Sequence, residues 1–140
     1  MKISARNQIV GKITELEKGA VNSKVAMTQG GEKLVAIITN DAVQALSLAV
    51  GMEVSFIFKA QSVLVAKGAK GLKLSARNQI AGKVREIKEG AVNCEVIITT
   101  SAGITIVAII TKDAQHELAL AKGDEVHAII KASSILVGVN

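Results

Sequence analysis

The chain repeats itself, and this internal duplication restricts its fold more than any other feature of the 140-residue sequence. Ser-Ala-Arg-Asn-Gln-Ile at residues 4–9 recurs unchanged at 75–80, and Gly-Ala-Val-Asn at 19–22 recurs at 90–93. After one inserted residue near Gly103, Val-Ala-Ile-Ile-Thr at 35–39 recurs at 107–111. A duplication that fills the chain indicates two similar folded units. We therefore predict a first domain at residues 1–67, a connector at 68–71 and a second domain at 72–140.

Each repeat has the pattern of five short strands and one short helix. In the first repeat the strands are expected near residues 8–16, 21–28, 33–39, 53–60 and 62–66. The helix is expected at 40–48, with Thr39 or Asn40 as its N-cap, and at 113–120 in the second repeat. This order favours an all-β fold with one short helix per repeat, built as two tandem five-stranded barrels like the oligonucleotide-binding (OB) fold. The fifth strand is expected to close the barrel of its own repeat.

The composition narrows the class of protein and its location. The chain is 49% hydrophobic, and its net charge of +5 divides into +4 for residues 1–70 and +1 for residues 71–140. This balance permits anion binding without requiring nucleic acid. No leader-like or membrane-spanning apolar stretch is found, so we expect a cytoplasmic protein with no membrane partner. Because two small barrels cannot bury all of the aliphatic side chains, we also expect self-association.

The usual signatures of catalysis and metal binding are missing. There is no GxxxxGK[ST], GxSxG or HExxH motif, and the single cysteine, Cys94, excludes a cysteine-only metal site. His116 and His127 align with Gln44 and Ser55, so neither is a catalytic group used by both repeats. We expect no enzyme activity, no cofactor and no metal held by side chains. The acids that recur in both repeats are explained by their positions: Asp41 and Asp113 lie in the first turn of the expected helices, and Glu53 and Glu125 lie at a solvated strand edge. We therefore do not expect them to act in acid–base catalysis.

Donors suited to an oxyanion do recur in both repeats. Ser4 and Arg6 precede the first strand and Lys59 ends the fourth, and their counterparts are Ser75, Arg77 and Lys131. A tetrahedral oxyanion needs converging N–H and O–H donors with compensating positive charge. Backbone amides at Ala5, Ala60 and the helix start near Thr39 could complete such a shell. From spacing alone, a surface ion pair for Arg6 and a solvated strand end for Lys59 remain equally open readings.

The repeated motifs resemble one known family over essentially the whole chain. Ser-Ala-Arg-Asn-Gln-Ile-x-Gly-Lys, Gly-Ala-Val-Asn, Ala-Ile-Ile-Thr and Lys-Ala-x-Ser are similar to the Mop domain of the molbindins, and two copies resemble the di-Mop members. The resemblance implies an OB-type barrel that binds molybdate and tungstate reversibly for intracellular molybdenum storage or homeostasis. It also implies a homotrimer with oxyanion sites between domains.

The resemblance implies a set of site residues in each repeat. In the first repeat, Ser4 and Arg6 would donate with the Ala5 amide between them, joined by Lys59 and the Ala60 amide, with Thr39 contributing at the helix start. The matching positions of the second repeat are Ser75, Ala76, Arg77, Thr111, Lys131 and Ala132. Both sets are intact, so we expect both repeats to bind.

Two further expectations concern a second class of site and a rival function. The family also has oxyanion sites on a three-fold axis, which we expect near the turns at Ala20, Val21 and Asn22 and at Ala91, Val92 and Asn93, although a purely structural turn stays open. The rival function is nucleic-acid binding, which usually needs aromatic stacking platforms. Only Phe56 and Phe58 are available, and the second repeat has Ala128 and Ile130 instead. We therefore expect no nucleic-acid partner.

Overall fold

The computed structural model describes residues 2–68 and 73–140 and contains the strands and helices expected in each repeat. The first repeat forms β1 (Asn7–Lys18), β2 (Asn22–Gln29), β3 (Glu32–Thr39), α1 (Asn40–Ala45), β4 (Glu53–Phe58) and β5 (Leu64–Lys67). The second forms β6 (Asn78–Glu89), β7 (Asn93–Thr100), β8 (Thr105–Thr111), α2 (Lys112–Glu117), β9 (Glu125–Ile130) and β10 (Leu136–Gly138). Single-turn 3₁₀ helices, η1 (Ala60–Ser62) and η2 (Ala132–Ser134), precede the two fifth strands. The all-β class with two curled five-stranded sheets is confirmed.

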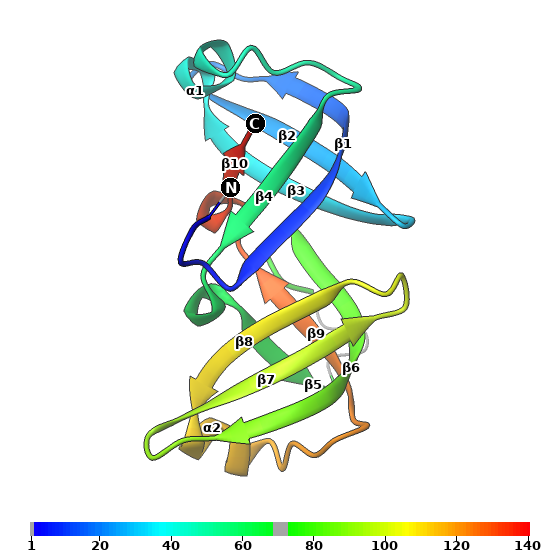
Figure 1. Cartoon of the computed structure of the whole chain (residues 1–140), viewed down its shortest axis with the longest axis vertical. Helices are drawn as coiled ribbons and strands as arrows, with labels where there is room; N and C mark the ends of the chain where they lie inside the picture. The colour runs from blue at the N-terminus through cyan, green and yellow to red at the C-terminus, as the bar shows by residue number, and fades with distance from the viewer. Residues whose placement is uncertain (1, 69–72) are drawn as a thin grey trace.

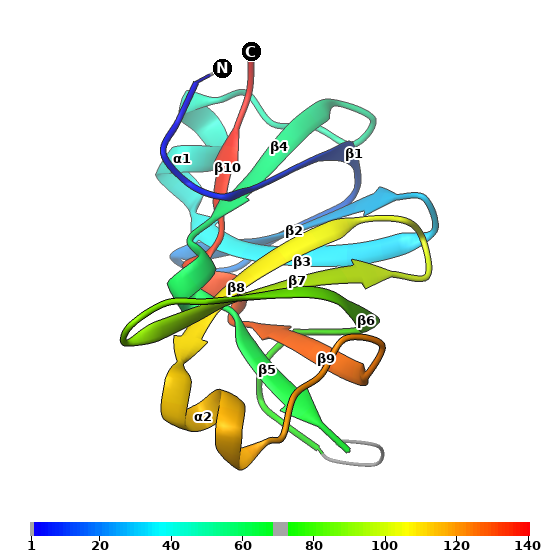
Figure 2. The same ribbon diagram turned by 60° about the horizontal axis from the view of Figure 1, so that its bottom comes forward.

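The two fifth strands are exchanged between the barrels. One sheet has the order β10-β4-β1-β2-β3 and the other β5-β9-β6-β7-β8. In Figure 1 the red β10 lies among the blue and cyan strands of the first repeat, and in Figure 2 the green β5 lies beside β9. The expectation that each fifth strand closes its own barrel is therefore wrong. Residues 1–67 and 72–140 describe repeats, whereas each barrel combines both; residues 69–71 of the expected connector lie outside the described residues.

The exchanged arms also cover the neighbouring barrel. Three consecutive residues of β3, Leu34, Val35 and Ala36, are buried, as expected for a strand covered on both faces. Val35 packs against η2 of the other repeat, because Val35, Ala26 and Ala132 of η2 form a small apolar cluster. The main core contains residues of both barrels, including Phe56 and Phe58, which are 0% and 2% exposed.

The first strand of each repeat curls because it alternates burial and carries a glycine where the sheet folds on itself. In β1, Asn7, Ile9, Gly11 and Ile13 are buried, and the residue between each two of them is exposed. A Cβ built on Gly11 would lie 2.8 Å from the Thr28 carbonyl oxygen, and one on Gly82 would lie 2.8 Å from the Thr99 carbonyl oxygen. Any larger side chain at these positions would push neighbouring strands apart.

Both helices begin at a threonine cap. The hydroxyls of Thr39 and Thr111 accept a hydrogen bond at 3.1 Å from the backbone N–H of Ala42 and Ala114, respectively. The prediction of Thr39 as an N-cap is confirmed, and the cap satisfies one of the free N–H groups at each helix start. Within the described part of the chain, no helix has the length and apolarity needed to cross a membrane.

The exchanged strand β5 is anchored to the second barrel by Lys67. Its ammonium lies 3.1 Å from the Asp124 carboxylate and donates to the Ala119 carbonyl oxygen at 3.0 Å. The Asp124 carboxylate also accepts the backbone N–H of Ala121. This N–H, together with Lys67, lowers the pKa of Asp124 below its usual value. The anchor thus links the end of one repeat to the loop after α2 of the other.

Candidate functional site

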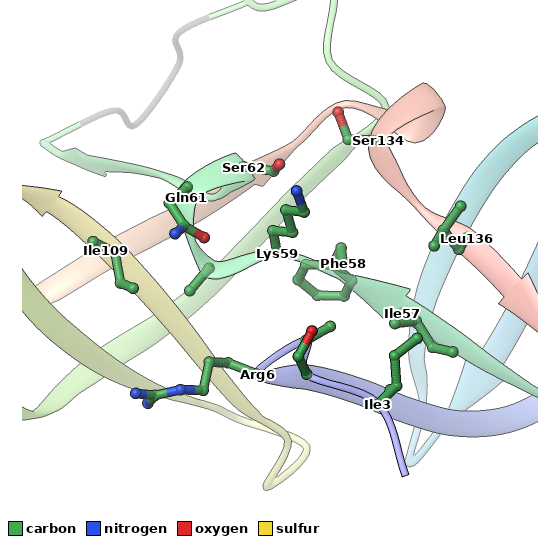
Figure 3. Close-up of a pocket in the computed structure, with 13 residues that line it drawn as sticks. Ile3, Arg6, Ile57, Phe58, Lys59, Gln61, Ser62, Ile109, Ser134 and Leu136 are labelled. Carbon is green, nitrogen blue, oxygen red and sulfur yellow. The ribbon is translucent and has the colours of Figure 1, made fainter. Parts of the chain in front are cut away.

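A pocket of about 630 Å³ gathers most of the donors predicted for the first repeat. Figure 3 shows it beside η1, with the Ser-Ala-Arg segment entering below and the exchanged β10 on the far side. Among the predicted residues, it is lined by Ser4, Ala5, Arg6, Lys59 and Ala60. The segment before β1 and the end of β4 meet here because β1 and β4 are antiparallel neighbours, with Asn7 paired to Phe58.

A second pocket of about 590 Å³ repeats this arrangement around η2. It is lined by Ser75, Ala76, Arg77, Lys131 and Ala132, the corresponding residues of the second repeat. Each pocket is also lined by a strand of the opposite repeat: Ile109 of β8 lines the first pocket and Ile37 of β3 lines the second. Gln61, Ser62 and Ser134 line both, so the two pockets adjoin at the 3₁₀ helices. None of these three polar residues was singled out from the sequence.

The two cations of the first pocket share it but point apart. In Figure 3 the ammonium of Lys59 is directed toward the side of Ser62, whereas the guanidinium of Arg6 is directed toward the strand that carries Ile109. Arg6 Nη1 lies 2.9 Å from Glu95 Oε1 of β7. The surface ion pair that the sequence left open for Arg6 is therefore formed, although the residue also lines the pocket.

The second pocket differs from the first in its charged surroundings. Within residues 2–68 and 73–140, Arg77 has no ion pair, and it lines a smaller hollow together with Lys24 of β2. Lys24 lies 3.4 Å from both Glu15 and Glu17. Hydrogen bonds from Lys33 and from Lys24 lower the pKa of Glu15, so its carboxylate stays ionised over the neutral range.

Asn7 and Asn78 hold the two halves of each site together, and sequence reasoning missed them. The amide of Asn78 donates to the Val35 carbonyl oxygen and accepts the Val35 N–H, both at 2.8 Å. Asn7 does the same with Val107, also at 2.8 Å. Each asparagine is 2% exposed and satisfies the free edge of the third strand in the other barrel. Their unchanged recurrence beside an arginine was the only signal in the sequence.

The next residue of the repeated motif shapes the donor segment. The side-chain amide of Gln8 donates to the carbonyl oxygens of Ile3 and Ala5, and that of Gln79 donates to those of Leu74 and Ala76. These bonds fold the chain around the serine and arginine before each first strand. The block Ser-Ala-Arg-Asn-Gln therefore combines two anion donors with two residues that position them.

Thr39 and Thr111 lie outside both pockets. Each hydroxyl is used in its helix cap, and Thr39 lines a separate pocket of about 390 Å³ with Ala20 and Val21 of the β1–β2 turn. Within one chain, the structure therefore does not bring these threonines to the serine, arginine and lysine that the resemblance grouped with them.

The turns expected near a three-fold axis are exposed at the ends of the first hairpins. Val21 and Val92 are 70% and 72% exposed, while the N–H groups of Gly19 and Gly90 are bonded within the turns to Asn22 and Asn93. The second-repeat turn also contains Ala91. Both turns therefore present Val side chains and free loop surface rather than a closed cavity within one chain.

The remaining candidates from the sequence are packed or isolated groups. Cys94 is buried, and Phe56 and Phe58 lie in the core, although Phe58 also lines the first pocket. At 0% and 2% exposure, the two rings do not form a surface platform on which nucleic-acid bases could stack. In the described part of the chain, no three His, Cys, Asp or Glu side chains gather where they could hold a metal ion. The side chains of the predicted set that line the two pockets are thus cations and hydroxyls, which are the donors that an anion site requires.

Comparison with known proteins assigns both halves to one family. The TOBE domain model matches residues 3–65 and 74–137. The chain is 39% identical over 140 residues to the molybdenum transport protein ModE of Azotobacter vinelandii, and this match covers 99% of the chain and 52% of ModE. It is also 46% identical over 68 residues to a probable molybdenum-pterin-binding protein of Haemophilus influenzae, covering 49% of the chain and 99% of that protein. The chain thus spans about half the length of the longer curated relatives.

A solved structure matches the fold of the chain over its whole length. The cytoplasmic molybdate-binding protein ModG, crystallised with molybdate bound, has a TM-score of 0.96 and 43% sequence identity, and the match covers 100% of both chains.

Proposed function

The chain belongs to the TOBE-domain family in both of its halves, and from this premise we propose that it binds molybdate reversibly and without catalysis. The observation that carries the proposal is that each of two pockets is lined by a serine, an arginine, a lysine and two alanines of the recurring set, which come from two adjacent segments. The similarity to ModG, which was crystallised with molybdate, supports the same ligand here.

The donor set suits a tetrahedral dianion. One guanidinium and one ammonium balance two negative charges, while hydroxyl and backbone N–H groups donate to the oxygens without adding charge. In the first site we assign Ser4, Arg6 and Lys59 with the amides of Ala5 and Ala60, and in the second Ser75, Arg77 and Lys131 with those of Ala76 and Ala132. Binding through oxo groups leaves the metal's own coordination shell unchanged. Tungstate, with the same shape and charge, is expected to bind as well, and the role is intracellular molybdenum storage or homeostasis.

We propose that the sites are completed in a homotrimer. Large apolar side chains are exposed at the rims of both pockets: Ile3 and Leu136 at the first, and Leu64 and Leu74 at the second. A neighbouring copy would cover these rims, dry the pockets and strengthen the charge interactions inside them. Thr39 and Thr111, and the exposed turns at residues 20–22 and 91–93, would then act from other copies or at the three-fold axis.

The proposal is tested by dialysis against molybdate in excess sulfate, followed by metal analysis. The double variant Arg6→Ala with Arg77→Ala should lose most of the bound molybdenum. Arg85→Ala, which removes an exposed arginine outside both pockets, is the matched control and should bind normally. Unchanged molybdenum content in the double variant would refute the assigned sites, and equal competition by sulfate would refute a preference for molybdate. Light scattering with and without molybdate tests the trimer, and a monomeric mass under both conditions would exclude it.

A further inference from the structure

We propose that the two pockets of one chain bind the oxyanion with different strength, because Glu95 forms an ion pair with Arg6 while no carboxylate of the described residues forms one with Arg77. The inference rests on the proposed function and adds to it a residue that sets the relative affinity of the sites. Its basis is a charge reversal between the repeats. Glu95 on β7 and Lys24 on β2 occupy the same position of the duplicated sequence.

At the first pocket, the carboxylate of Glu95 already forms an ion pair with Arg6. Arg6 Nη1 lies 2.9 Å from Glu95 Oε1, and the guanidinium points away from Lys59, as Figure 3 shows. The Arg6 side chain is 55% exposed and that of Glu95 is 19% exposed, so this pair is weak enough to break but not negligible. An oxyanion entering this pocket must draw Arg6 away from Glu95, or bind with Lys59 as its main cation.

At the second pocket, the position equivalent to Glu95 is occupied by Lys24. Arg77, Lys24 and Glu17 line one hollow together with Ile37, which also lines the second pocket. Lys24 is held by Glu15 and Glu17, so the two acids neutralise Lys24 rather than Arg77. Among the described residues no carboxylate lies within ion-pair distance of Arg77. Its guanidinium is therefore available to an incoming anion.

The difference predicts an order of filling. The pocket of Arg77 and Lys131 fills first, and the pocket of Arg6 and Lys59 fills at higher molybdate concentration. Removing the Glu95 charge should raise the affinity of the first pocket by about 3- to 10-fold, the range expected for one charge at a partly exposed position acting on a dianion. Because the effect is electrostatic, it should shrink as ionic strength rises.

The experiment isolates each pocket before changing Glu95. Arg77→Ala leaves the first pocket and Arg6→Ala leaves the second, and molybdate binding to each is measured by titration calorimetry at low and high ionic strength. Glu95→Gln is then added to both backgrounds. Glu117→Gln on α2, at the far end of the second barrel, removes the same charge away from the site and serves as control.

We expect Glu95→Gln to tighten binding in the Arg77→Ala background only, with a smaller gain at high ionic strength. Equal affinities of the two pockets, or no gain from Glu95→Gln where the Arg77→Ala protein binds, would overturn the inference while leaving the proposed function intact. A gain in the Arg6→Ala background as well would also overturn it, because the effect would not pass through Arg6. If the unchanged protein binds no molybdate, the proposed function and the inference fail together.

Discussion

Asn78 offers the sharpest test of how the two repeats are joined. Its side-chain amide makes three hydrogen bonds to backbone groups: 2.8 Å to the Val35 N–H, 2.8 Å to the Val35 carbonyl and 3.1 Å to the Ile130 carbonyl. The residue is 2% exposed, so water does not reach these groups. Replacement by alanine would leave the buried N–H and C=O of Val35 without partners.

The expected loss of stability follows from those two orphaned groups. A buried, unsatisfied polar group costs about 1–3 kcal/mol, so the loss of both partners in Asn78→Ala should lower the free energy of unfolding by about 2–6 kcal/mol. Asn7→Ala breaks the equivalent bonds to Val107, which are only partly buried, and should cost less. The site should suffer with the fold, because Arg77 directly precedes Asn78 and its position depends on this bond.

The measurement is urea unfolding followed by circular dichroism, since the chain has no Trp or Tyr for fluorescence. Protein concentration is held constant because assembly would shift the apparent stability. Gln79→Ala is the matched control: it removes a neighbouring amide whose bonds, at 3.3 and 3.1 Å, are exposed, and it should cost under about 1 kcal/mol. A loss below about 1 kcal/mol for Asn78→Ala would refute the idea that this contact joins the barrels.

Two other predictions follow from packing and from charge. Gly82→Ala should lower the free energy of unfolding by about 1–3 kcal/mol in the same assay, because the new Cβ would lie 2.7 Å from Ile98 Cγ2 and 2.8 Å from the Thr99 carbonyl oxygen. Gly103→Ala is the control, since its Cβ would meet no neighbour within 4 Å and only its positive φ would oppose the change. A loss at Gly82 that is no larger than the loss at Gly103 would contradict crowding as the cause. The contact between Lys67 and Asp124 that anchors β5 should weaken in acid. The pKa of Asp124 is lowered in the folded protein, so the stabilisation is present above the ordinary value of 3.8 and is lost as the pH falls below it. Unfolding curves across that range should therefore show a smaller loss of unfolding free energy for Asp124→Asn than for the unchanged protein.

Local structure was predictable from the sequence because burial alternates with a period of two and the turns carry glycine. The third strand showed as a continuous apolar run, and the cap at Thr39 followed from its place before Asp41. The strand exchange was not predictable in the same way. β5 and β10 both begin Leu-Val, so either could complete either barrel, and the choice depends on the path of the chain after η1 and η2.

Most of the residues that line the two pockets together could be grouped from the sequence, because serine, arginine and lysine recur at matching positions of the two repeats. Asn7 and Asn78 were missed because their partners are backbone groups of the opposite repeat, which no local pattern can specify. Thr39 was assigned to the pocket by resemblance, whereas its hydroxyl is used by the helix. Glu95 could be noticed only once the duplicated positions were seen to face opposite arginines.

Because each barrel takes its last strand from the other repeat, neither half of this chain is a self-sufficient module. A fragment carrying one repeat would lack the piece that finishes its sheet and would display a loose arm shaped for a twin. Two such fragments could complete each other's sheets by exchanging their fifth strands. In the intact chain the two repeats are covalently linked, so the same exchange takes place within one molecule. We therefore expect that a destabilising change in one repeat also destabilises the other, and that the two barrels unfold together in one transition.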